Sequence, residues 1–110
     1  MWLLINKVNG LLGLSAKSGN ILAGTDLVLD EMLKKRVKLV ILASDASEKT
    51  KKNMKYYCDK ANVEIVIYGT IEENSKAIGK KNKAVLAIKD RNLADAIKKV
   101  IHGGEAFGKN

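Results

Sequence analysis

The stretch of sequence that decides the fold runs from Val37 to Thr50 and reads VKLVILASDASEKT. Its apolar run from Leu39 to Ala43 predicts a strand buried on both faces, because a strand with one wet face would alternate apolar and polar residues. A polar turn follows at 44–47, and Ser47 is a suitable N-cap for the charged helix after it. This strand, turn and helix predict the first half of a parallel βαβ unit. The turn falls at the carboxyl end of the strand, where open α/β sheets usually bind ligands.

Helices and strands alternate on both sides of this unit. The spacing of apolar residues predicts helices over residues 4–16, 24–36, 47–60, 72–78 and 90–101. It predicts further strands over residues 21–23, 63–68 and 84–88. We expect Gly103-Gly104 to end the last helix and the tail over about 103–110 to be frayed. On the third helix we expect Tyr57 to face inward, since the adjacent residues Tyr56 and Tyr57 cannot both face solvent if one side of the helix is buried.

This order of elements predicts one α/β domain over residues 1–110, a three-layer α-β-α sandwich with a mixed, about four-stranded central sheet. The main competitor is a flavodoxin-like, doubly wound sheet. That fold normally needs five parallel strands, and a chain of 110 residues is short for it. The four-stranded sandwich is therefore the preferred prediction.

Composition places the chain among globular proteins, with 46% apolar and 29% charged residues. The single cysteine, Cys58, rules out an internal disulfide. The N-terminus lacks the basic segment of a signal peptide, and no apolar run is long enough to cross a bilayer. We therefore expect a cytoplasmic protein without a membrane partner, and a monomer.

The formal net charge is +8, and it is unevenly distributed. Eight basic residues against two acidic ones lie between Lys34 and Lys55, and four lysines with no acid lie between Lys76 and Lys83. Two such stretches at one end of the molecule would form a contact surface for a polyanion. The alternative is a solvated lysine-rich surface of the kind common in small soluble proteins.

The sequence contains no recognisable catalytic set. One histidine, His102, and one cysteine cannot form a zinc site of the usual ligands, and no phosphate-binding glycine motif follows a strand. Asp45 follows the central strand but lacks the companion acids of a metal or phosphoryl site, so an enzyme built on Asp45 is the least favoured hypothesis. We expect no metal and no cofactor. The aromatic content of 5% also argues against a stacking platform for single strands, which leaves folded RNA recognised by shape.

Several segments resemble the L7Ae/L30e ribosomal-protein family, in particular its small bacterial members, over about residues 4–101. They are LLGLSAKSGN at 11–20, GTD at 24–26, KLVILASDAS at 38–47 followed by Lys49-Thr50, and KAIGK at 76–80. The resemblance implies an L30e-like sandwich and a non-catalytic protein that binds kink-turn or similarly bent internal-loop RNA. Its implied partners are structured RNA such as rRNA and, through it, the ribosome.

In the family, the glycine-initiated helix after the edge strand docks on the RNA, and here this segment is 24–30. The RNA-contacting residues that we expect are Lys17, Asn20, Gly24, Thr25, Asp26, Lys34, Lys35, Lys80, Lys81 and Lys83. The chain departs from the family pattern at Asp26, Leu27 and Asp30, because RNA-binding relatives typically carry an amide or Lys, a polar residue and Lys there. We therefore expect RNA binding that is weaker or altered relative to archaeal relatives. The alternative is a protein-interaction module that keeps the fold without specific RNA recognition.

Overall fold

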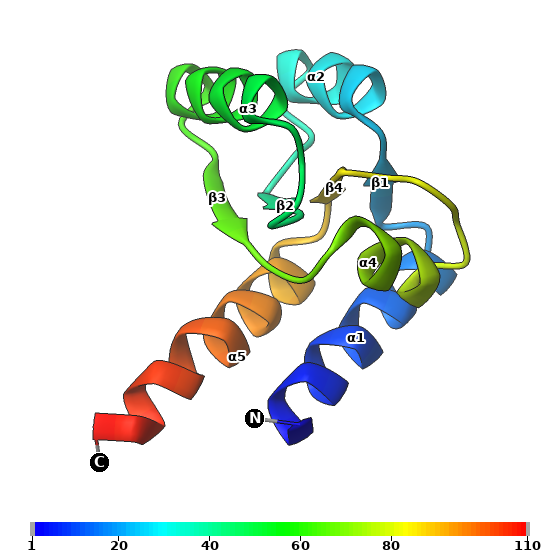
Figure 1. The fold of residues 1–110 in the computed structure, drawn as a ribbon. Helices are drawn as coiled ribbons and strands as arrows, with labels where there is room; N and C mark the ends of the chain where they lie inside the picture. Colours follow the sequence, from blue (N-terminus) through cyan, green and yellow to red (C-terminus); the bar gives the residue numbers. More distant parts are fainter. Residues whose placement is uncertain (1, 110) are drawn as a thin grey trace.

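The computed structural model describes the backbone of residues 2–109 and the side chains of residues 7–103. Helices and strands alternate along it (Figure 1). The helices are α1 (Trp2–Lys17), α2 (Thr25–Leu33), α3 (Glu48–Ala61), α4 (Ile71–Ala77) and α5 (Arg91–Lys109). The strands are β1 (Ile21–Ala23), β2 (Leu39–Leu42), β3 (Glu64–Ile67) and β4 (Val85–Ile88). The predicted order of elements is confirmed.

The four strands form one mixed sheet in the order β1-β4-β2-β3. Strands β2 and β3 are parallel, with Leu39 opposite Glu64, whereas β4 runs antiparallel to both β1 and β2. Four mixed strands confirm the predicted sandwich and exclude a five-stranded parallel sheet within the part of the chain that the structure describes.

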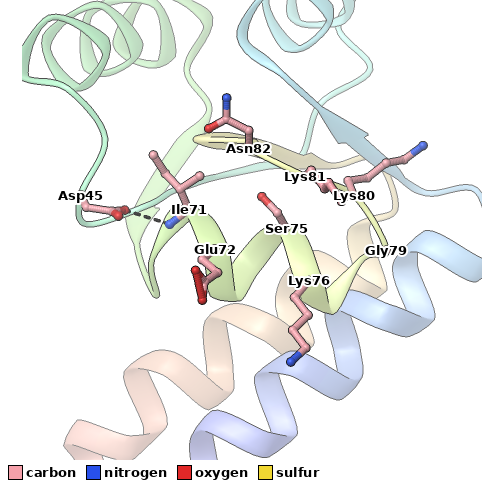
Figure 2. A pocket seen from close by; sticks show the side chains of 9 residues that line it. All are labelled: Asp45, Ile71, Glu72, Ser75, Lys76, Gly79, Lys80, Lys81 and Asn82. Carbon is pink, nitrogen blue, oxygen red and sulfur yellow. Dashed lines mark hydrogen bonds between the residues drawn. The ribbon is translucent and has the colours of Figure 1, made fainter.

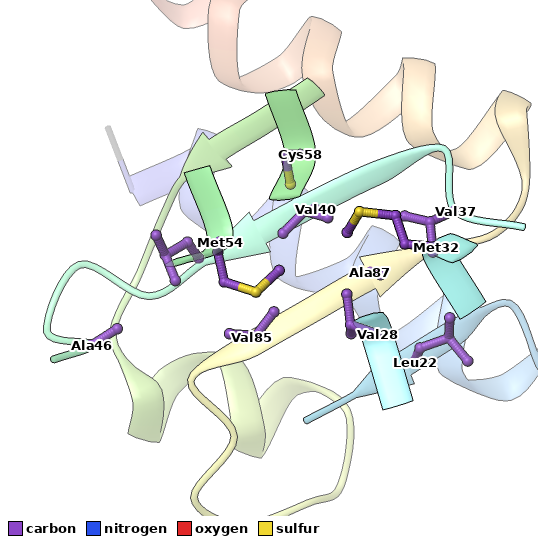
Figure 3. Packing of buried hydrophobic residues seen from close by; sticks show 11 residues of the cluster. Leu22, Val28, Met32, Val37, Val40, Ala46, Met54, Cys58, Val85 and Ala87 are labelled. Atoms are coloured by element: carbon purple, nitrogen blue, oxygen red, sulfur yellow. The ribbon is translucent and has the colours of Figure 1, made fainter. Parts of the chain in front are cut away.

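Helices cover both faces of the sheet, so its two central strands are buried on both sides. Val40 and Leu42 of β2 point toward α2 and α3, and this core cluster also includes Met32, Met54 and Cys58 (Figure 3). Leu39 and Ile41 point to the other face, toward α1, α4 and α5. The apolar run of β2 is therefore continuous because both faces of the strand are buried, as predicted from the sequence.

Side chains fix where three helices begin. The Ser47 hydroxyl accepts a hydrogen bond from the N–H of Thr50 at the start of α3, as predicted. Thr70 and Glu73 form a reciprocal capping box at the start of α4, and Asp90 caps α5 by accepting from the N–H of Leu93. These caps satisfy N–H groups that have no acceptor within their own helix.

Two details of the sequence prediction are wrong. Helix α5 does not stop at Gly103-Gly104 but continues to Lys109. A glycine costs a helix only about 1 kcal/mol relative to alanine, and no proline follows to break the hydrogen-bond ladder. The predicted fraying of the tail stays a prediction. Tyr57 does not face inward: Tyr56 and Tyr57 are 56% and 44% exposed, and their rings pack edge to face.

A membrane-spanning helix is not found among the described residues, since none of the helices there is both long and apolar enough to cross a bilayer.

Candidate functional site

The sheet has two ends with different chemistry. At one end, the N–H of Gly24 donates to Val85 O, and the N–H of Ala43 donates to Ala84 O. At the other end, the N–H of Lys89 donates to Asn20 O. We call the first the Gly24 end; it comprises residues 24–27, 44–45 and 80–83. We call the second the Asn20 end; it comprises residues 17–20, 34–38 and 89–91.

The structure divides the ten residues expected to contact RNA between these two ends. Gly24, Thr25, Asp26, Lys80, Lys81 and Lys83 lie at the Gly24 end, whereas Lys17, Asn20, Lys34 and Lys35 lie at the Asn20 end. Strands of three or four residues and the nine-residue helix α2 separate the two groups by roughly 13 Å. Only a ligand larger than this separation can contact both groups at once.

Lys34 is already neutralised by neighbouring carboxylates. Its Nζ lies 3.1 Å from Asp30 Oδ2 and 3.6 Å from Glu31 Oε2, and Arg36 also approaches Glu31 at 3.7 Å. The hydrogen bond and charge of Asp30 raise the pKa of Lys34. The same pairing compensates the charges of Asp30 and Glu31, and it leaves Asp26 in the first turn without a basic partner among the described residues.

The start of α2 is uncapped. Gly24 occupies the N-cap position and no side chain in the described part of the chain accepts from the first-turn N–H groups, whereas α3, α4 and α5 are each capped by a side chain. Free N–H groups at a helix start, together with the positive end of the helix dipole, form an anion-binding position.

Lys83 stands directly beside this helix start. Its Nζ lies 3.9 Å from the point that a Cβ atom on Gly24 would occupy. Gly24 has φ 105° and ψ 145°, a backbone conformation that is essentially restricted to glycine. Residues almost sixty positions apart in the sequence thus place an ammonium group and free N–H groups side by side.

Ser75 of α4 holds the loop that carries Lys83. The buried Ser75 hydroxyl accepts from the N–H of Lys83 at 2.8 Å, and the Ser75 carbonyl accepts from the N–H of Lys80 at 2.8 Å. Within the loop, Asn82 adopts a left-handed conformation with φ 57°. The basic loop is therefore anchored at both ends.

An open pocket of about 720 Å³ lies between this loop, α4 and Asp45 (Figure 2). Lys76, Lys80 and Lys81 line it, and none of the three has an acidic partner among the described residues. Asp45 Oδ1 accepts from the N–H of Ile71 at 2.8 Å, so the aspartate after the central strand holds the start of α4.

The residues predicted to contact RNA did not include Ser75, Lys76 and Asn82, which also belong to this region. Lys76 was visible as the start of a lysine-rich stretch, and the left-handed Asn82 lies in a basic turn of the type in which asparagine is common. The sequence did not indicate a role for Ser75, because a serine in a short helix is common. Only the tertiary structure shows that its hydroxyl binds the backbone of Lys83.

The arrangement is suited to binding an anionic polymer. It offers free N–H groups, three or more ammonium groups and the 46% exposed side chain of Leu27. No group of three or more His, Cys, Asp or Glu side chains able to hold a metal ion occurs among the described residues. Cys58 is buried in the core, and burial raises the pKa of its thiol to about 11.

The fold and this end of the sheet define a small L30e-like α/β sandwich protein. The chain belongs to the ribosomal protein L7Ae/L30e/S12e/Gadd45 family, whose model matches residues 6–98. The family predicted from the sequence is thereby confirmed. L7Ae-family RNA-binding proteins are non-catalytic, in agreement with the prediction that this chain is not an enzyme.

Two relatives are named RNA-binding protein YlxQ. The one from Bacillus subtilis is 36% identical over 90 residues, covering 79% of this chain and 87% of the relative. The one from Enterococcus faecium is 32% identical over 97 residues, covering 88% of this chain and 93% of the relative. The predicted likeness to small bacterial members of the family is confirmed.

Two solved structures share the fold. A Bacillus halodurans protein of unknown function superposes with a TM-score of 0.84 at 31% identity, covering 87% of this chain and 97% of the other. The Giardia lamblia 15.5kD RNA binding protein superposes with a TM-score of 0.73 at 20% identity, covering 94% of this chain and 88% of the other. The second likeness concerns the fold alone.

Proposed function

We propose that this protein binds RNA through the Gly24 end and recognises a kink-turn or a similarly bent internal loop. The observation that carries the proposal is the uncapped start of α2 beside Lys83, because it supplies free N–H donors and positive charge at one point. The names of the YlxQ relatives support RNA as the ligand class.

In this proposal, the backbone N–H groups of Thr25 and Asp26 donate to a phosphate at the bend of the RNA. Lys80, Lys81 and Lys83 act as point charges toward flanking phosphates, and the exposed Leu27 packs on a base at the widened groove. A bent RNA suits the site, since the α2 start and the basic loop flank one corner of the molecule rather than a long flat face.

Ribosome association and a cytoplasmic location are further parts of the proposal. Structured rRNA contains many bent internal loops, and a protein with a net charge of +8 is attracted to it over long range. Co-sedimentation of the protein with ribosomal particles, lost in a Lys80→Gln/Lys83→Gln variant, would support this part. Migration only in the unbound fractions at moderate salt would contradict it.

The test of RNA recognition compares a kink-turn RNA with the same duplex in which Watson–Crick pairs replace the sheared purine pairs, at matched salt. We expect clear preference for the kinked RNA and loss of that preference in the Lys80→Gln/Lys83→Gln variant. A Lys17→Gln/Lys35→Gln variant is the matched control, because it removes the same charge at the Asn20 end. Equal, salt-sensitive binding of both RNAs would refute kink-turn recognition, and absence of binding to either would refute RNA binding of this class.

A further inference from the structure

An apolar groove lies between α2 and α3, away from the Gly24 end. Leu29, Met32 and Leu33 line it from α2, and Tyr57 and Ala61 line it from α3. Its volume is about 560 Å³. The groove lies in the C-terminal halves of both helices, whereas the proposed RNA contacts lie at the start of α2.

Several large apolar side chains at this groove are exposed, although Met32 is buried in the core. Leu33 is 85% exposed, and Tyr56 and Tyr57 beside it are 56% and 44% exposed. Of the six large apolar side chains that are exposed in the described residues, Leu33 and Tyr57 therefore line the groove, and Tyr56 packs its ring against that of Tyr57. Such a cluster with a concave centre is typical of an interaction surface, whereas single exposed apolar residues are common on any protein.

The charged side chains that line the groove are basic. Lys35 and Lys60 also line it, and the Lys60 ammonium lies 5.3 Å from the centre of the Tyr56 ring. On α3, the lysines without an acidic partner among the described residues are Lys49 and Lys52 in the half toward the Gly24 end, and Lys55 and Lys60 in the half that carries the groove. Lys35 after α2 is likewise unpaired among the described residues. On the same two helices Asp26 and Asp59 are the unpaired acids, and Asp26 lies at the distant Gly24 end.

We propose that this groove binds an acidic amphipathic helix of a partner protein. Apolar side chains three and four positions apart on that helix would contact Leu33 and Tyr57, and its Asp and Glu side chains would face Lys35 and Lys60. A groove between two helices can accept a third helix. Such a helix binds through apolar side chains spaced three and four positions apart in its sequence.

Charge argues against a second copy of this chain as the occupant, and the apolar lining argues against an RNA. A second copy of this chain would bring the same lysines from both copies together, because a two-fold interface pairs each patch with itself. An RNA would pair with the lysines but would leave Leu29 and Leu33 without a complementary apolar surface. An acidic apolar helix satisfies both features.

The experiment selects helical peptides from a display library on the full-length protein. We expect enriched peptides to combine apolar residues at three- and four-residue spacing with flanking Asp and Glu. Binding of the best peptide should weaken at least tenfold in Leu33→Ser and in Lys35→Glu/Lys60→Glu, and its addition should shift the NMR signals of Leu33 and Tyr57. Leu14→Ser, at a 52% exposed leucine on α1, is the matched control and should bind normally.

Enrichment of basic peptides, or of peptides that bind Leu33→Ser equally well, would overturn the proposal. So would displacement of the peptide by kink-turn RNA, or a dimer in sedimentation that Leu33→Ser dissociates. Peptide binding that persists while the protein fails to bind kink-turn RNA would leave this inference standing and refute the proposed RNA function alone.

Discussion

The hydroxyl of Ser75 accepts a 2.8 Å hydrogen bond from the N–H of Lys83, which ties the basic loop to α4. The bond is partly buried, with Ser75 itself in the core, and it spans eight residues, so it fixes where the backbone of Lys83 lies relative to Gly24. We expect Ser75→Ala to leave that N–H unsatisfied, at a cost of about 1–3 kcal/mol in the free energy of unfolding. RNA affinity should fall as well, as measured by a fluorescence titration.

The control for Ser75→Ala is Asp90→Ala. It removes the cap of α5 at the opposite end of the sheet and should cost about 1 kcal/mol of stability while RNA affinity is kept. If both variants lowered RNA affinity equally, Ser75 would act on stability alone and would have no positioning role.

Replacement of Gly24 tests the close approach to Lys83. Ala at φ 105° is strained and its methyl group would lie 3.9 Å from Lys83 Nζ, so we expect Gly24→Ala to lose about 1–3 kcal/mol of stability and to bind RNA at least tenfold more weakly. Gly10→Ala is the matched control. That glycine lies in the interior of α1 with open space around it, so alanine should raise stability by about 1 kcal/mol and leave RNA binding unchanged. Chemical denaturation measures the stability of both variants, and RNA titration measures their affinity.

The salt dependence of RNA binding should separate the lysines of the two ends. Each of Lys80→Gln and Lys83→Gln should lower the slope of log K against log salt by about 1, because each removes one phosphate contact. Lys34→Gln should leave the slope unchanged, since Asp30 and Glu31 already neutralise that ammonium group. A smaller slope for Lys34→Gln than for the wild-type protein would contradict the assignment of the RNA contacts to the Gly24 end.

The Asp26 carboxylate should stabilise the folded protein and weaken its binding to RNA. Its carboxylate is favourable at the positive end of α2 but faces any phosphate that binds there. We expect Asp26→Asn to lower stability by about 0.3–1 kcal/mol and to raise RNA affinity severalfold. Parallel denaturation and binding curves measure both effects. An Asp26→Asn protein with reduced affinity would show that this carboxylate contacts the RNA favourably, for example by accepting from a base.

Because the thiol of Cys58 is buried, we expect the protein to lose stability at alkaline pH. Burial raises the pKa of Cys58 to about 11 from its ordinary value of 9.0, so the folded protein keeps this proton longer than the unfolded chain does. The stabilisation is complete below about pH 9 and is lost as the pH rises from 9 to 11, with a slope of at most about 1.4 kcal/mol per pH unit. Denaturation curves of the wild-type protein and Cys58→Ala should converge over this range. A constant difference between them would contradict the raised pKa.

Local patterns were sufficient to predict most of the fold. The doubly buried strand at Leu39–Leu42 and the Ser47 cap both follow from neighbours in the sequence, and the structure agrees with each. The continuation of α5 past Gly103-Gly104 was missed because two glycines weaken a helix without breaking it. The exposed Tyr57 was missed because amphipathic spacing predicts a buried side, and here α2 leaves part of that side open.

The candidate site was predicted less completely, since it depends on contacts between distant residues. Sequence proximity grouped Lys34 and Lys35 with Gly24, yet nine residues of helix carry them to the other end of the sheet. The departure from the family pattern at Asp30 predicted weaker or altered RNA binding, whereas the ion pair of Asp30 with Lys34 compensates much of its charge. Only the folded chain reveals such pairings.

The position of β4 has a consequence for the order of events on the translating ribosome. Strand β4 follows the other described strands in the sequence and is inserted between β1 and β2. The carbonyls of Val85 in β4 and of Ala84 just before it accept from the N–H groups of Gly24 and Ala43. A nascent chain that has not yet released residues 84–88 therefore has neither a closed sheet nor an assembled Gly24 end. If the Gly24 end is the RNA site proposed above, RNA binding requires synthesis to have passed residue 88, and a chain truncated before β4 would lack RNA binding altogether rather than retain part of it.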